Sequence, residues 1–262
     1  MLAGCTTQSV LQSVEPLSSE KYAAIVVDAS SGQVLYENHA RDPRYPASLT
    51  KMMTLYMLFE ALDAGRVSMA TPLPVSSYAA ARPPSKLYLK SGQTIDVEAA
   101  VLALCVKSAN DVATVVAEHL GGSEQRFAEM MTSKARQLGM SSTTFRNASG
   151  LPDDGQTTTA RDMVILASAL RARFPHYYHY FKNREFAYAG KVIRGHNRLL
   201  AKPGVDGLKT GYIRASGFNV ATSATAGGKR VFAVVMGGDS AAARDEHMAE
   251  LIDTYLPRAG NR

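Results

Sequence analysis

Residues 46–52 read PASLTKM and open an apolar run that continues to Asp63. The run is apolar on most sides, so we expect a buried helix over residues 48–63, ended by Gly65. A serine at the start of such a helix lies where free backbone N–H groups stabilise negative charge. Lys51 follows Ser48 one turn later on the same face, and burial lowers the pKa of a lysine toward a neutral, basic amine. Ser48 and Lys51 are therefore candidates for a nucleophile and its base.

Neither this motif nor two other short motifs in the chain is specific on its own. A second Ser-x-x-Lys, Ser18 to Lys21, lies in a polar stretch with no apolar helix to bury it, so we interpret it as a chance match. The sequence Ser108-Ala109-Asn110 lies at a predicted break between two helices, where a simple helix cap is the competing interpretation. The sequence Lys209-Thr210-Gly211 lies on a predicted strand, where the glycine permits close backbone approach by a ligand.

The order of predicted elements indicates an α+β fold. Hairpin signals occur at both ends of the chain, with a helical region of about residues 64–180 inserted between them. We therefore expect an antiparallel sheet built from both termini. The predicted strands are 21–28, 33–38, 184–194, 206–213, 217–226 and 230–237. The predicted helices after the first are 96–106, 110–120, 123–138, 159–170 and 241–255, with Ser123 and Thr159 as caps.

Composition excludes several classes of function. The 262 residues are 46% hydrophobic and 20% charged, which is typical of a globular protein. The net charge is +6, but the longest basic stretch is only Arg171-Ala172-Arg173, so we expect no nucleic-acid partner. The six histidines lack metal-ligand spacing and no phosphate-binding or dinucleotide-binding motif occurs, so we expect no metal and no cofactor.

The two cysteines lie in different contexts. Cys105 lies in an apolar run and is predicted to fill core space. The sequence Leu2-Ala3-Gly4-Cys5 resembles a bacterial lipobox, in which the cysteine carries lipid. Residues 1–20 are then a leader or tether, and residues 21–262 form a single domain. No apolar run approaches the roughly 20 residues that a membrane-spanning helix needs.

Taken together, the three motifs are far more specific than any one of them. They follow in the order Ser48, Ser108 and Lys209, separated by 60 and 101 residues. They resemble the S-x-x-K, S-x-N and K-T-G motifs of penicillin-recognising serine enzymes. The sequence segments around the three motifs narrow the resemblance to one family, over residues 21–256. They resemble the low-molecular-weight penicillin-binding proteins, the D-alanyl-D-alanine carboxypeptidases. The flanking segments are GLPD at 150–153, TARDM at 159–163, GHNRLL at 195–200 and VDGLKTG at 205–211.

The resemblance implies a fold and four catalytic side chains. The fold is the β-lactamase/transpeptidase-like one, a five-stranded antiparallel sheet with helices on its faces. Ser48 is implied as the residue that attacks the carbonyl between two terminal D-alanines, with Lys51 taking its proton. Ser108 is implied to pass a proton to the departing amine, and Asn110 to hold the substrate amide and orient Lys51.

The resemblance also implies a substrate-binding set. Lys209, Thr210 and Arg198 are implied to receive the terminal carboxylate, and the backbone N–H groups of Ser48 and Tyr212 to form an oxyanion hole beside Gly211. Many carboxypeptidases have histidine at the position of Tyr212, which bears on substrate preference and on deacylation. The implied partners are a peptidoglycan stem peptide and β-lactam antibiotics as covalent inhibitors, in an exported protein of the periplasm or cell envelope.

Three alternatives to a carboxypeptidase stay open. A class A β-lactamase needs a Glu-x-x-x-Asn loop after the S-x-N motif, but the loop at residues 147–158 carries only Asp153 and Asp154 as acids. A D,D-endopeptidase that cuts cross-links shares all three motifs. A non-catalytic wall-binding module is the third alternative, disfavoured by the complete set of polar groups.

Overall fold

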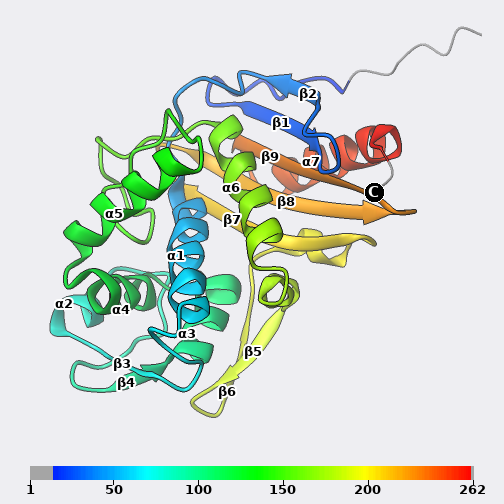
Figure 1. Cartoon of the computed structure of the whole chain (residues 1–262). Coiled ribbons are helices and arrows are strands. Elements are labelled where there is room, and N and C mark those ends of the chain that lie inside the picture. The colour runs from blue at the N-terminus through cyan, green and yellow to red at the C-terminus, as the bar shows by residue number, and fades with distance from the viewer. Residues whose placement is uncertain (1–13, 261–262) are drawn as a thin grey trace, which may run out of the picture.

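A five-stranded antiparallel sheet organises the protein (Figure 1). The structure is a computed structural model that describes residues 14–260, so Cys5 and its predicted lipid lie outside the described residues. The strand order is β2-β1-β9-β8-β7. The strands are β1 (Ala23–Asp28), β2 (Val34–Asn38), β7 (Val205–Ile213), β8 (Gly217–Ala226) and β9 (Lys229–Gly238). The predicted sheet from both termini is confirmed.

Both faces of this sheet are covered by helices. Along β9, Phe232 and Val234 point into the core with α1 (Lys51–Asp63) and α6 (Ala160–Arg173), while Ala233 and Val235 pack under α7 (Ala241–Tyr255). Figure 1 shows α6 crossing one face and α7 lying behind the other. Because successive side chains of a strand alternate between faces, burial on both sides requires an unbroken apolar run.

The inserted helical region follows the predicted pattern closely. Ser123 caps its helix by accepting the N–H of Arg126, and Thr159 caps α6 by accepting the N–H of Asp162. The predicted break near Ser108 is present, because a π-helical turn ends at Lys107 and α4 begins at Asn110. The elements are β3 (Pro72–Pro74), α2 (Ser77–Ala80), β4 (Thr94–Asp96), α3 (Val97–Leu102), η2 (Ala103–Lys107), α4 (Asn110–Gly121) and α5 (Glu124–Gln137).

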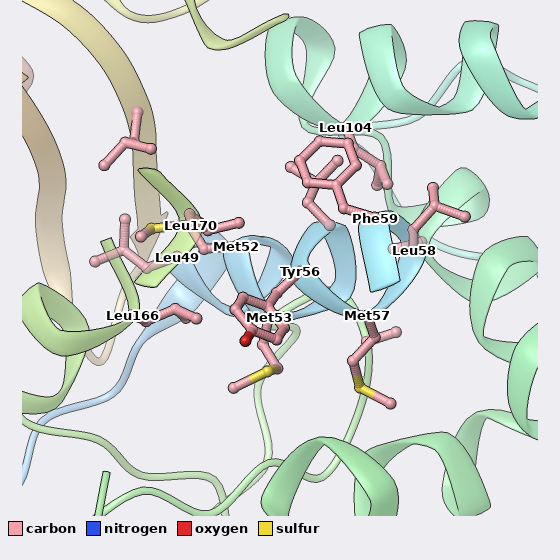
Figure 2. Close-up of a cluster of buried hydrophobic side chains, with 14 of the residues drawn as sticks. Leu49, Met52, Met53, Tyr56, Met57, Leu58, Phe59, Leu104, Leu166 and Leu170 are labelled. Atoms are coloured by element: carbon pink, nitrogen blue, oxygen red, sulfur yellow. The ribbon is translucent and has the colours of Figure 1, made fainter. Parts of the chain in front are cut away.

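Helix α1 is buried on nearly all sides, as the sequence predicts. Figure 2 shows its side chains directed all round the helix, toward Leu104 on one side and toward Leu166 and Leu170 of α6 on another. Its start differs from the prediction. Residues Ala47–Thr50 form a 3₁₀ turn, η1, and the α-helix begins at Lys51. Ala47 has a φ of +47°, so the chain enters the turn from a conformation that cannot extend the helix backwards.

Residues 184–194, predicted as one strand, form a hairpin outside the main sheet. Strand β5 (Glu185–Tyr188) pairs with β6 (Lys191–Arg194) through a turn at Ala189 and Gly190, whose φ values are +48° and +74°. Two consecutive positive φ values are what a tight hairpin turn requires. The remaining short helices are η3 (Tyr178–Lys182), η4 (Arg198–Ala201) and η5 (Leu256–Arg258).

Asp111 in α4 anchors the segment that contains Leu87 and Leu89. Its fully buried carboxylate accepts the N–H groups of Leu87 and Leu89, each at 3.1 Å, and that of Val112 at 2.9 Å. Asp111→Asn places an amide donor against these donors, so we expect a loss of about 2–4 kcal/mol in the free energy of unfolding, measured with urea.

The matched control for this variant is Asp96→Asn. Asp96 is exposed and makes no capping hydrogen bond, so its replacement is expected to change stability by less than about 0.5 kcal/mol. Equal losses in the two variants would contradict an anchoring role for Asp111.

Candidate active site

Ser48 is positioned by the close approach of β7 to the 3₁₀ turn. A Cβ atom placed on Gly211 would lie 2.9 Å from the backbone N of Ser48 and 3.2 Å from that of Leu49. Only glycine fits at this distance. From the sequence, we expect this glycine to let a ligand approach the backbone closely. In the structure, the backbone of η1 occupies the space beside it.

The Lys51 amine is the most enclosed polar group of the site. Lys51 is 0% exposed, and its Nζ lies 3.2 Å from Ser48 Oγ, 2.7 Å from Asn110 Oδ1 and 2.5 Å from the carbonyl oxygen of Ser149. Burial, followed by the charge of Lys209, lowers its pKa well below the ordinary 10.5. A lysine in this setting can be neutral near pH 7 and accept a proton from the Ser48 hydroxyl.

Asn110 joins the amine to the wall of the site. Its Nδ2 donates to the carbonyl oxygen of Pro83 at 3.0 Å, and its backbone N–H donates to that of Ser85 at 2.7 Å. The side-chain oxygen contacts Lys51, which agrees with an orienting role. One amide N–H remains for a substrate, because an asparagine amide carries two.

Ser108 combines two unfavourable features. It has a left-handed backbone, with φ +60° and ψ +40°, and it is 6% exposed. Its Oγ is buried without a hydrogen-bond partner among residues 14–260. Each feature costs free energy on its own, and strained residues of this kind concentrate at functional sites. Ser108 lines the same cleft as Ser48, so its unpartnered hydroxyl lies beside the space that a ligand would occupy.

Lys209 lies behind the cleft on β7. It is 3% exposed, and its Nζ donates to the carbonyl oxygen of Thr210 at 2.8 Å. Burial, its largest perturbation, lowers its pKa to about 7, with a further lowering from the charge of Arg244. A lysine with that pKa carries a charge that responds to pH in the physiological range.

A cleft of about 480 Å³ collects nearly all of the predicted site residues. Lys51 and Lys209 are buried behind its surface, where they can act through the groups that line it. The predicted residues that line the cleft are Ser48, Ser108, Asn110, Arg198, Thr210, Gly211 and Tyr212.

Arg244 lines the cleft as well, and no sequence motif pointed to it. It lies in the first turn of α7, is 3% exposed, and donates to Asp245 Oδ1 at 2.9 and 2.7 Å and to the carbonyl oxygen of Asn219 at 3.2 Å. With Arg198, it gives the cleft two guanidinium groups, which are well suited to a carboxylate. Its burial is known only from the folded structure, so no signal in the sequence could have identified it.

The loop facing Lys51 carries no acidic side chain into the cleft. Asn147 Oδ1 accepts the N–H groups of Ser149 and Gly150, which holds the turn that presents the Ser149 carbonyl. Asp153 and Asp154 are exposed, and neither lines the cleft. This arrangement lacks the carboxylate that a class A β-lactamase requires.

Residues 14–260 contain neither a metal-binding cluster of acidic, histidine or cysteine side chains nor a membrane-spanning helix. No group of three or more histidine, cysteine, aspartate or glutamate side chains is placed to hold a metal ion. No helix in this part of the chain combines the length and the apolar character that crossing a bilayer requires.

Comparison with known proteins supports the resemblance on which the site was predicted. The D-alanyl-D-alanine carboxypeptidase DacC of Escherichia coli is 36% identical over 234 residues, which are 86% of this chain and 58% of that protein. The crystal structure of DacD from Francisella tularensis matches with a TM-score of 0.88 at 29% identity, covering 95% of this chain and 73% of the other. Penicillin-binding protein D2 from Listeria monocytogenes, solved in a cefotaxime-bound form, matches with a TM-score of 0.84 at 32% identity, covering 93% and 99%.

The extent of these matches defines the family. The chain spans 58–66% of the length of the first curated relatives it matches. The solved structures confirm the expected fold, a five-stranded antiparallel sheet from both termini with helices. The family model for peptidase S11, described as D-alanyl-D-alanine carboxypeptidase, matches residues 10–240. The chain therefore belongs to the S11 family of D-alanyl-D-alanine carboxypeptidases.

Proposed function

We propose that this protein is a serine carboxypeptidase that removes the terminal D-alanine from peptidoglycan stem peptides through an acyl-enzyme, and that penicillins inhibit it. The observation that carries the proposal is the 3.2 Å separation between Ser48 Oγ and the buried Lys51 amine, at the edge of a cleft with two arginines. The substrate places the protein outside the cytoplasmic membrane, in the periplasm or cell envelope, with Cys5 as the candidate lipid attachment site.

In the first step, Ser48 attacks the carbonyl carbon between the two D-alanines. Its proton passes to the neutral Lys51 amine, for which the distance and the lowered pKa are suitable. The backbone N–H groups of Ser48 and Tyr212 stabilise the oxyanion, an effect typically worth about 3–4 kcal/mol per donor. The close contact of Gly211 with η1 supports this role, because it holds β7 against the nucleophile.

In the second step, the departing amine needs a proton. The unpartnered Ser108 hydroxyl is proposed to deliver it as the C–N bond breaks, with Lys209 behind it as the source of positive charge. The proton that Lys51 took from Ser48 then replaces the Ser108 proton, which leaves Lys51 neutral again. Arg198, Arg244 and Thr210 receive the terminal carboxylate from the walls of the cleft, and the charge of buried Lys209 attracts it from behind. Water then releases the acyl group with Lys51 as base, slowly for a penicillin, since no cleft carboxylate assists.

The first prediction concerns the nucleophile. Incubation with a penicillin is expected to add one drug mass to the wild-type protein, measured by intact mass spectrometry, and none to Ser48→Ala. The matched control is Ser18→Ala, which removes the exposed serine of the other Ser-x-x-Lys and is expected to acylate like wild type. An unmodified wild type, or an acylated Ser48→Ala, would contradict the assignment of Ser48.

The second prediction concerns the product. A soluble pentapeptide ending in D-alanyl-D-alanine is expected to release free D-alanine, and a purified cross-linked muropeptide is expected to be cut far more slowly, both followed by chromatography. Faster cleavage of the cross-linked muropeptide indicates an endopeptidase instead. Normal acylation by penicillin with no turnover of either substrate indicates a wall-binding protein.

The third prediction concerns pH. The second-order rate constant of acylation is expected to rise with pH as Lys51 loses its proton. It then falls above about pH 7, roughly tenfold per pH unit, as Lys209 loses the charge that attracts the carboxylate. Arginine keeps its proton throughout this range, so Lys209→Arg should shift the alkaline fall to higher pH. An unchanged alkaline limb in Lys209→Arg would show that Lys209 does not cause it.

A further inference from the structure

The positive charge of this protein is concentrated in one segment. Residues 171–202 contain eight lysines and arginines but a single acidic residue, Glu185, which gives this segment a charge of +7. The whole chain has a net charge of +6, so the other residues together carry −1. We call residues 171–202 the cationic segment. No long basic run marks it in the sequence, because its cations alternate with aromatic and aliphatic residues.

Half of these eight cations face solvent with no ion-pair partner among the described residues. Lys182, Arg184 and Lys191 are exposed and have no ion-pair partner within residues 14–260. Arg194 approaches Glu185 at 3.4 Å, but both side chains are more than half exposed, so the pair contributes little. Arg173 approaches Glu60 at 3.9 Å and Lys202 pairs with Asp253 at 2.7 Å, so part of the charge is offset. A scattered surface charge is ordinary, but four unpaired cations within one segment create a local positive potential.

The cationic segment is continuous with the active-site cleft. It contains the end of α6, η3, the β5–β6 hairpin and η4, and Figure 1 shows the hairpin projecting away from the sheet. Directly after β6, Gly195 and His196 line the cleft, and Arg198 of η4 lines it too. Leu200 of the same short helix lines a second hollow of about 450 Å³, together with Arg171 and Lys182. The cations therefore extend from the cleft to a neighbouring hollow.

We propose that the cationic segment is a docking surface for the carboxylate-bearing peptidoglycan strand whose stem peptide enters the cleft. The proposal rests on the proposed function and adds to it a polymeric substrate held outside the cleft. Peptidoglycan carries carboxylates on successive stem peptides, so it complements a row of cations rather than a single site. Holding the strand beside the cleft raises the local concentration of scissile peptides.

The surface fits this occupant better than an anionic membrane. Membrane-binding surfaces combine cations with several exposed apolar side chains that enter the lipid. The large hydrophobic side chains that are exposed within residues 14–260 are Tyr78, Tyr88, Val192 and Tyr212, and of these only Val192 belongs to the cationic segment. A membrane is also not a ligand that the adjoining cleft could use.

Charge reversal with a matched control tests the proposal. The test variant is the triple change Lys182→Glu, Arg184→Glu and Lys191→Glu. The control is Arg66→Glu, Lys90→Glu and Arg126→Glu, which makes the same change in net charge at exposed positions outside the cationic segment. Retention on purified peptidoglycan sacculi is measured by sedimentation at about 0.02 M and about 0.5 M salt, where charges are weakly and strongly screened. Acylation by penicillin verifies that each variant is folded.

We expect the test variant to be retained about tenfold less than wild type at low salt, the control to behave like wild type, and all three proteins to converge at high salt. Equal retention of test and control variants would overturn the proposal. So would binding of wild type to vesicles of phosphatidylcholine with about one third phosphatidylglycerol but not to sacculi, which would assign the surface to a membrane. Release of D-alanine from the soluble pentapeptide reports the proposed function separately, since that peptide does not need the docking surface.

Discussion

The burial of one amine organises this structure. Lys51 Nζ has no exposure to water, and its three oxygen partners come from η1, from the start of α4 and from the turn at residues 147–151. An isolated buried charge would cost several kcal/mol, so the amine must either keep all of these acceptors or lose its proton. Both solutions fix its position beside Ser48. The same burial therefore holds three distant segments together and prepares a base.

The rest of the fold preserves this arrangement from both sides. On one side, the absence of a side chain at Gly211 lets β7 lie against the N–H groups of η1, so the sheet determines where Ser48 lies. On the other side, Asp111 and Asn110 tie the segment around Pro83–Leu89 to α4, and Pro84, Ser85 and Asn110 line the cleft there. The cleft is thus a junction between a rigid sheet and a helical region, and Ser108 meets it in a strained conformation.

Local sequence patterns predicted most helices and strands of the fold. Some of the features that they did not predict depend on contacts between residues distant in the sequence. The final helix was predicted with its observed bounds, and the caps at Ser123 and Thr159 are present, because both depend on neighbours in sequence. The hairpin at residues 184–194 was missed because Gly190 is the single typical turn residue in it, and the other positive-φ position of its turn is an alanine, Ala189. Arg244 could not be read from motif spacing, since only the folded chain brings α7 to the cleft. The charge of the cationic segment can be counted from the sequence, but only the folded chain shows that the segment adjoins the cleft.

The central claim is that the Lys51 amine is neutral when Ser48 reacts, and its titration tests this most directly. Lysine labelled with ¹³C at Cε and ¹⁵N at Nζ can be followed by NMR as pH is varied, with the Lys51 signal assigned from Lys51→Arg. The structure predicts a midpoint well below the ordinary 10.5, because the amine is buried and Lys209 lies near. A midpoint near 10.5 would mean that Lys51 is an ammonium at neutral pH, which would contradict its role as the base.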